Sequence, residues 1–94
     1  MGAVLLKIYA ISIPRFANRY RYIHEELARK TSLPWQVLGI DGAEHHRKST
    51  DWPHNPTLRD SQVGCALSHV EACRRMLEDG ADYAVMLEDD VVLP

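Results

Sequence analysis

The chain has 94 residues, of which 46% are hydrophobic and 26% charged, and its formal net charge is −2. This length allows one small domain and excludes a second, while the near-neutral composition is that of a globular protein and argues against nucleic acid as a partner. The apolar run over residues 3 to 13 is shorter than the roughly 20 residues of a transmembrane helix. It also lacks the basic leader and cleavage site of a signal peptide, so we expect a cytoplasmic protein with no transmembrane segment.

Two elements are predicted in the first third of the chain. Residues 4 to 13 are dense in aliphatic side chains and stop at Pro14, which is typical of a central strand that runs into a loop. A helix follows, because apolar residues recur at steps of four, three and four. Asn18 is a candidate N-terminal cap, and the helix should end before Pro34. The apolar stripe consists of Phe16, Tyr20, Ile23 and Leu27.

The middle of the chain predicts a short strand and a long loop. Residues 35 to 40 favour a second strand that ends at the turn signal Asp41-Gly42. Residues 43 to 59 have the weakest periodicity in the chain, and we expect a surface loop there. Loops of this length in a small domain are usually functional. The predicted loop contains a cluster of basic residues, and the simplest interpretation is that they are solvated at the surface. A mobile basic loop that covers a diphosphate would have the same composition. The cluster is His45, His46, Arg47, Lys48 and Arg59.

A second helix and a third strand complete the prediction. The helix should begin at Asp60 or Ser61 and end at Gly80, a residue that commonly stops helices. Residues 83 to 93 are rich in Val and Leu and indicate a strand buried on both faces. The predicted apolar stripe of the helix is Val63, Leu67, Val70, Cys73 and Leu77.

Three consecutive carboxylates, Glu88, Asp89 and Asp90, interrupt this last apolar run. Desolvating them without a cation would cost several kcal/mol. Strand alternation places Glu88 and Asp90 on one side and Asp89 on the other. Carboxylate oxygens suit hard ions such as Mg²⁺ or Mn²⁺, which keep positions open for phosphate oxygens. A solvated acidic turn is the simpler alternative.

The order strand, helix, strand, loop, helix, strand predicts an α/β fold with parallel strands and right-handed crossover helices. In open sheets of this kind, ligands collect beyond the carboxyl ends of the strands. Those ends carry residues 12 to 15, residues 41 to 42 and residues 88 to 90. We therefore expect one crevice formed by three strand ends.

Four blocks of sequence together resemble glycosyltransferase family 25, which includes bacterial lipooligosaccharide galactosyltransferases and animal collagen galactosyltransferases. The most specific is a Gly-Cys-Ala-Leu-Ser-His block placed shortly before an apolar strand that ends in Glu-Asp-Asp. The resemblance extends over nearly all 94 residues. The four blocks are Ile11-Ser12-Ile13 with Arg19, Gly39-Ile40-Asp41-Gly42, residues 63 to 69, and residues 87 to 92.

The resemblance implies a partial GT-A, Rossmann-like fold that binds a nucleotide sugar, with the acidic triplet in the role of the Asp-x-Asp motif. Glu88 and Asp90 would hold Mn²⁺ (or Mg²⁺), a Lewis acid that neutralises the departing diphosphate. The implied reaction moves a sugar, galactose by resemblance, from a UDP-sugar to a lipooligosaccharide or other glycan acceptor. Peripheral association with the inner membrane would fit such an acceptor. The implied nucleotide-sugar-binding residues are Ser12, Arg19, Asp41, Ser68, His69, Glu88 and Asp89.

The chain departs from the family pattern in two respects. Ser12 stands where the family usually has Asn, and Pro14-Arg15-Phe16 replaces a polar turn. Family members also continue beyond the acidic motif. We therefore expect residues 1 to 94 to form a single truncated domain, the donor-binding half, which is incomplete as a catalyst alone and whose catalytic residues are not identified.

Two other functions compete with sugar transfer. One is a non-catalytic remnant or binding module that needs a partner or forms homo-oligomers through an uncovered sheet edge or apolar face. The other is a phosphoryl-transfer or receiver-like domain with an acidic Mg²⁺ pocket. The second is disfavoured because the chain has no glycine-rich phosphate loop.

Several candidate residues also have structural interpretations. Ser68 and His69 could be a structural pair, with the hydroxyl bonded back to its helix, and Arg19 could be a plain surface cation. Cys65, His69 and Cys73 share a helical face, but about 12 Å of rise between the two cysteines excludes both a disulfide and one shared ion. A zinc site on this face is a minor alternative. Two free thiols fit a reducing compartment.

Overall fold

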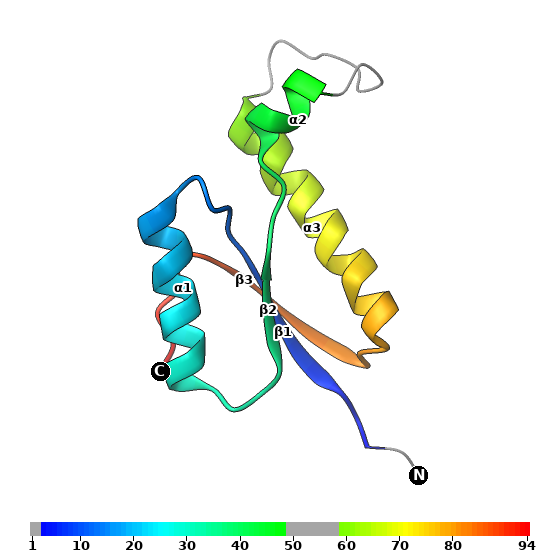
Figure 1. The fold of residues 1–94 in the computed structure, drawn as a ribbon. Coiled ribbons are helices and arrows are strands. Elements are labelled where there is room, and N and C mark those ends of the chain that lie inside the picture. The colour runs from blue at the N-terminus through cyan, green and yellow to red at the C-terminus, as the bar shows by residue number, and fades with distance from the viewer. Residues whose placement is uncertain (1–2, 49–58) are drawn as a thin grey trace.

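The chain forms a three-stranded sheet flanked by helices, in a computed structural model that describes residues 3–48 and 59–94. This architecture, shown in Figure 1, confirms the predicted α/β class with parallel strands. The elements are β1 (Leu6–Ile11), α1 (Ala17–Lys30), β2 (Trp35–Leu38), α2 (Gly42–Lys48), α3 (Asp60–Asp79) and β3 (Tyr83–Glu88).

The most apolar strand, β1, lies at the centre of the sheet, whose order is β2-β1-β3. It pairs in parallel with β2 and with β3. In this register Ile11 lies opposite both Leu38 and Glu88, which are the last residues of their strands. All three strands therefore end at the same level.

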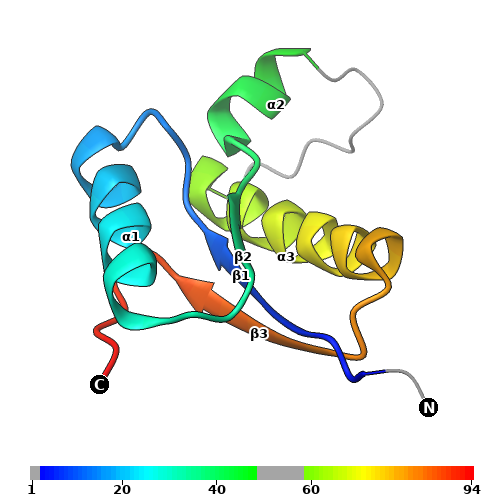
Figure 2. The same ribbon diagram turned by 60° about the horizontal axis from the view of Figure 1, so that its bottom comes forward.

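Successive residues of β1 contact different helices, because side chains alternate between the faces of a sheet. Ile8 and Ala10 form the apolar core with Ile23 and Leu27 of α1. Tyr9 points to the other face and contacts α3. Figures 1 and 2 show α1 and α3 on opposite sides of the strands. The central strand β1 is thus covered on both faces. The expected burial of the third strand on both faces is wrong, because no residue of β3 is buried and Tyr83 and Val85 are 65% and 40% exposed.

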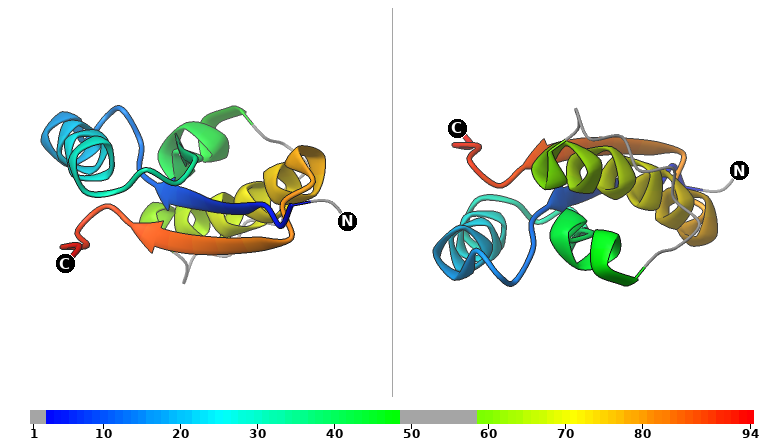
Figure 3. Two further views of the ribbon diagram at one scale, coloured as in Figure 1. Left: turned by 90° about the horizontal axis from the view of Figure 1, so that it is seen from below. Right: turned by 90° about the horizontal axis from the view of Figure 1, so that it is seen from above.

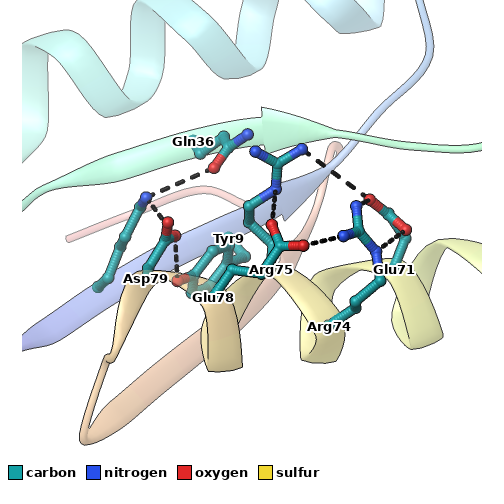
Figure 4. Close-up of polar contacts among 8 residues, drawn as sticks. Tyr9, Gln36, Glu71, Arg74, Arg75, Glu78 and Asp79 are labelled. Carbon is teal, nitrogen blue, oxygen red and sulfur yellow. Dashed lines mark hydrogen bonds and ion pairs between the residues drawn. The ribbon is translucent and has the colours of Figure 1, made fainter.

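A polar cluster on the α3 face fixes the end of that helix against the sheet. Tyr9 donates a hydrogen bond from its hydroxyl to Asp79 Oδ2 at 2.8 Å, and Lys7 Nζ lies 2.7 Å from the same oxygen. Figure 4 shows Tyr9 and Asp79 in contact. Burial, with a smaller contribution from Asp79, raises the pKa of the Tyr9 hydroxyl to about 12. The hydrogen bonds from Lys7 and Tyr9 lower the pKa of Asp79.

The predicted apolar stripe of α3 is largely wrong. The side chains of Val70 and Leu77 are 66% and 81% exposed, and Cys73 is exposed as well. The buried residues of this helix are Val63, Gly64, Ser68 and Ala72. These are mostly small, because a helix that approaches backbone closely has no room for large side chains. The second half of the predicted stripe, from Val70 onward, therefore lies on the outer face of α3, whereas Val63 at its start is buried.

Three further expectations differ from the structure. Residues 42 to 48 form the short helix α2 rather than a loop, and the rest of the predicted loop, residues 49 to 58, lies outside the described residues. Asn18 is not the cap of α1, whose N-cap is Phe16. The third strand ends at Glu88, five residues earlier than expected. A turn follows, closed by a 3.3 Å hydrogen bond from the Val91 amide to the Glu88 carbonyl, so the predicted alternation does not extend to Asp89 and Asp90.

The segment after this turn lies near α1, as Figure 3 shows. Tyr22 donates a hydrogen bond to the Val91 carbonyl at 2.8 Å, and the Leu93 amide donates to Glu26 Oε2 at 3.1 Å. Glu26 is buried, and the hydrogen bond from Arg29 is the main cause of its lowered pKa. This carboxylate therefore ties the last residues to the first helix.

Both outer strands have a free edge within the described sheet. On β3 the side chains of Tyr83 and Val85 are exposed. Uncovered edges of this kind favour pairing with another chain, and the oligomer expected on these grounds stays a prediction. In the described part of the chain, no helix combines the length and the hydropathy that crossing a membrane requires.

Leu27→Ala should lower the free energy of unfolding by about 2–5 kcal/mol, because it leaves a cavity in a fully buried core. The same change at the exposed Leu77 should alter it by less than about 0.5 kcal/mol. Urea unfolding followed by far-UV circular dichroism measures both variants. Equal losses would show that the exposed face of α3 is misassigned.

The lowered pKa of Asp79 predicts a pH-dependent contribution to stability. A carboxyl group with a lowered folded-state pKa stabilises the folded chain above its unfolded pKa, and this contribution disappears as pH falls through the folded-state pKa. Asp79→Asn should therefore be less stable than wild type near neutral pH, and the difference should close as pH falls below 3.8, the ordinary value. Denaturant unfolding at several pH values tests this, and a difference that stays constant on acidification would refute it.

Candidate functional site

A cavity of about 260 Å³ lies beyond the carboxyl ends of the strands. The chain passes from β1 to β2 on one side and returns to β3 on the other. The ends of β1 and β3 therefore flank a topological switch point, where open α/β sheets bind ligands. The predicted convergence of three strand ends is confirmed, because the lining includes residues 11 to 13, residues 88 to 90, and Ile40 and Gly42 after β2.

The acidic triplet lines this cavity from the end of β3. Ser12 donates a hydrogen bond from its hydroxyl to Asp89 Oδ2 at 2.8 Å, and Ser12 is 4% exposed. The buried hydroxyl thus orients one carboxylate across the switch point. Glu88 is paired in register with Ile11, so it shares the face of Tyr9 and points toward α3. Asp90 is exposed and lies in the turn.

These carboxylates have no cationic partner among residues 3–48 and 59–94, where no ion pair involves Glu88, Asp89 or Asp90. Three acids gathered without compensation at one rim repel each other. Their oxygens are the ligands that Mn²⁺ and Mg²⁺ prefer. The type of ligand atom therefore suits a hard divalent cation, although among the described residues the oxygens of the three acids do not all lie within 4.8 Å of one another.

Two arginines, Arg15 and Arg19, also line the cavity, and we call this part of the lining the arginine wall. Arg15 forms a two-pronged contact with Asp41, with Nε 2.7 Å from Oδ2 and Nη2 3.0 Å from Oδ1. Its guanidinium also lies 4.7 Å from the ring centre of Phe16. Arg19 lines the cavity, and in the described part of the chain its side chain has no hydrogen bond or ion pair. One cation is therefore held in place and the other is available to a ligand.

Asp41 supports the site without lining the cavity. Besides holding Arg15, its Oδ1 accepts a hydrogen bond from the Ala43 amide at 3.1 Å, at the start of α2. Arg15 is the main cause of the lowered pKa of Asp41. The predicted binding residue thus links the arginine wall to α2.

Ser68 and His69 have different surroundings. Ser68 lines the cavity, but its hydroxyl donates to the Gly64 carbonyl at 2.6 Å and accepts from the Ile40 amide at 2.8 Å. This arrangement favours the structural interpretation, in which the side chain holds the segment after β2 against α3. His69 lies outside the cavity lining and beside Cys65 and Glu88.

Two glycines allow α2 and α3 to meet beside the cavity. A Cβ atom on Gly64 would lie 2.9 Å from the Gly42 amide nitrogen, and one on Gly42 would lie 1.8 Å from the Asp60 carbonyl oxygen. Real Cβ contacts are not this short, so both positions require glycine. The close contact fixes the start of α2 and, through Asp41, the position of Arg15.

Six of the residues that the sequence predicts as binding or metal-ligating line this cavity, and their role in binding stays a prediction. The predicted residues that line it are Ser12, Arg19, Ser68, Glu88, Asp89 and Asp90. Arg15 belongs to residues 12 to 15, which the sequence places at the crevice, but it was not singled out as a binding residue. Sequence reasoning also missed Asp60, Ser61 and Cys65, whose positions depend on how α3 starts against the sheet.

Fold and cavity together define an α/β protein with a cavity at a switch point of the sheet. Within this class the chain belongs to glycosyltransferase family 25, described as LPS biosynthesis protein, whose family model matches residues 5–94. A Haemophilus influenzae protein whose provisional name is glycosyltransferase is 28% identical over 92 residues. That match covers 90% of this chain and 32% of the relative, so the chain spans about a third of the relative's length. No solved structure matches the chain.

Proposed function

We propose that the chain binds the diphosphate of a UDP-sugar together with Mn²⁺ or Mg²⁺, and that it supplies the donor-binding side of a sugar transferase. By family resemblance the sugar is galactose and the acceptor a lipooligosaccharide or another glycan. One observation carries the proposal: uncompensated carboxylates and an unpaired arginine line one cavity at the switch point of the sheet. Family membership supports it independently.

The carboxylates would hold the ion, with Glu88 and Asp90 as ligands and Asp89 oriented by Ser12. A bound divalent ion would act as a Lewis acid that neutralises charge on the departing diphosphate. Without a cation, the triplet would repel the same diphosphate. Metal binding should therefore precede or accompany nucleotide binding.

The arginines would contact the phosphate oxygens. Arg15 is already oriented by its two contacts with Asp41, so little side-chain freedom is lost when a ligand binds. Arg19 has no competing partner among the described residues and can turn to the ligand. A planar guanidinium can donate two parallel hydrogen bonds to two oxygens of one phosphate group, which the single ammonium group of lysine would not reproduce.

UDP-galactose should bind in the presence of Mn²⁺ and at least about 10-fold more weakly after chelation or in Asp90→Asn, because a ligand of the ion is lost. Glu25→Gln, which removes an exposed carboxylate of α1 away from the cavity, should bind like wild type. Isothermal titration calorimetry on the 94-residue chain measures these affinities.

A second variant separates the contribution of the arginine wall from that of the ion. Arg19→Gln should weaken UDP-galactose binding and leave the affinity for Mn²⁺ alone unchanged, because Arg19 is not an ion ligand in this proposal. Folded wild-type chain that shows no metal-dependent binding would refute the proposed function.

A further inference from the structure

Cys65, His69 and Glu88 come together beside the cavity although they belong to two elements. Cys65 and His69 lie one turn apart on α3, and Glu88 ends β3 on the face that α3 covers. One potential ligand atom from each residue, a thiol sulfur, an imidazole nitrogen and a carboxylate oxygen, lies within 4.8 Å of the other two. In the described part of the chain, none of these side chains is engaged in a hydrogen bond or ion pair.

The combination of ligand types is more informative than the acidity of the region. Sulfur and imidazole are ligands of zinc-class ions, whereas Mn²⁺ and Mg²⁺ favour oxygen. Bond lengths of about 2.0–2.3 Å to a tetrahedral ion place its ligands about 3.5 Å apart. Rotation of exposed side chains can close the present separations to that value. The helix spacing of four residues already places Cys65 and His69 on one face.

We propose that Cys65, His69 and Glu88 form a three-ligand site for Zn²⁺ or a similar borderline ion. Three protein ligands leave a fourth tetrahedral position for water or an exogenous ligand. Cys65 and Glu88 both line the cavity, so this position is next to the same space. Binding would convert the Cys65 thiol to a thiolate and release its proton to solvent.

This site differs from the hard-ion set by its sulfur and nitrogen ligands. Only Glu88 is common to the two sets, and Asp90 is not needed for zinc. Cys73 is not a ligand in this site, because it is exposed and lies two turns further along α3. It does not depend on the proposed binding of a nucleotide sugar.

Cobalt(II) reports the site directly, because thiolate ligation produces a charge-transfer absorption in the near ultraviolet. Wild-type chain should bind one Co²⁺ per chain with this absorption, and Zn²⁺ should displace it. Cys65→Ser and His69→Ala should lose the absorption or weaken binding at least about 10-fold. Cys73→Ser and Asp90→Asn should retain it. Circular dichroism confirms that each variant is folded.

Alkylation of the unmodified protein provides a test that needs no variant. Zn²⁺ should slow the reaction of Cys65 with iodoacetamide and leave that of Cys73 unchanged, as peptide mass spectrometry measures. Equal protection of both cysteines, no protection of either, or cobalt absorption that depends on Cys73 would overturn the proposal. One ion shared by two chains would overturn it as well.

Discussion

The parallel pairing of β1 with β3 is the constraint on which the site depends. It sets Ile11 opposite Glu88, so that Ser12 and Asp89 follow at the same level and their side chains meet. A shift of one residue in either strand would turn its buried side chains toward the wrong face. The packing of Ile8 against α1 and the bond of Tyr9 to Asp79 on the other face both oppose such a shift. Core packing therefore fixes the geometry of the polar rim.

The rim itself is stabilised unevenly. Hydrogen bonds hold Ser12 with Asp89 and Arg15 with Asp41. The side chains of Glu88, Asp90 and Arg19 make no hydrogen bond or ion pair in the part of the chain that the structure describes. Unpaired like charges cost stability that a ligand can recover. The oriented pairs would give the site its shape, and the unpaired groups would give it affinity for ions and phosphates.

The sequence was sufficient where a signal is local. The first strand and the helix after it could be predicted, because each depends on composition or periodicity within one segment. The same is true of the position of the acidic residues at the end of the third strand. The buried face of α3 could not be predicted. Its residues Gly64, Ser68 and Ala72 are small, which lets the helix pack closely, and they do not form a pattern of large apolar side chains. The proximity of Cys65 and Glu88 could not be predicted either, because it depends on α3 covering this face of β3.

The location of a bound ion tests the central claim most directly. Mn²⁺ is paramagnetic and broadens the NMR signals of nearby amides, so one titration in the presence of UDP maps its position. The amides of residues 11 to 13 and 88 to 90 should broaden first, while those of Lys7 and Tyr83, at the opposite end of the sheet, should stay sharp. Broadening that is strongest at Lys7 and Tyr83, or uniform over the chain, would contradict a cation site at the switch point.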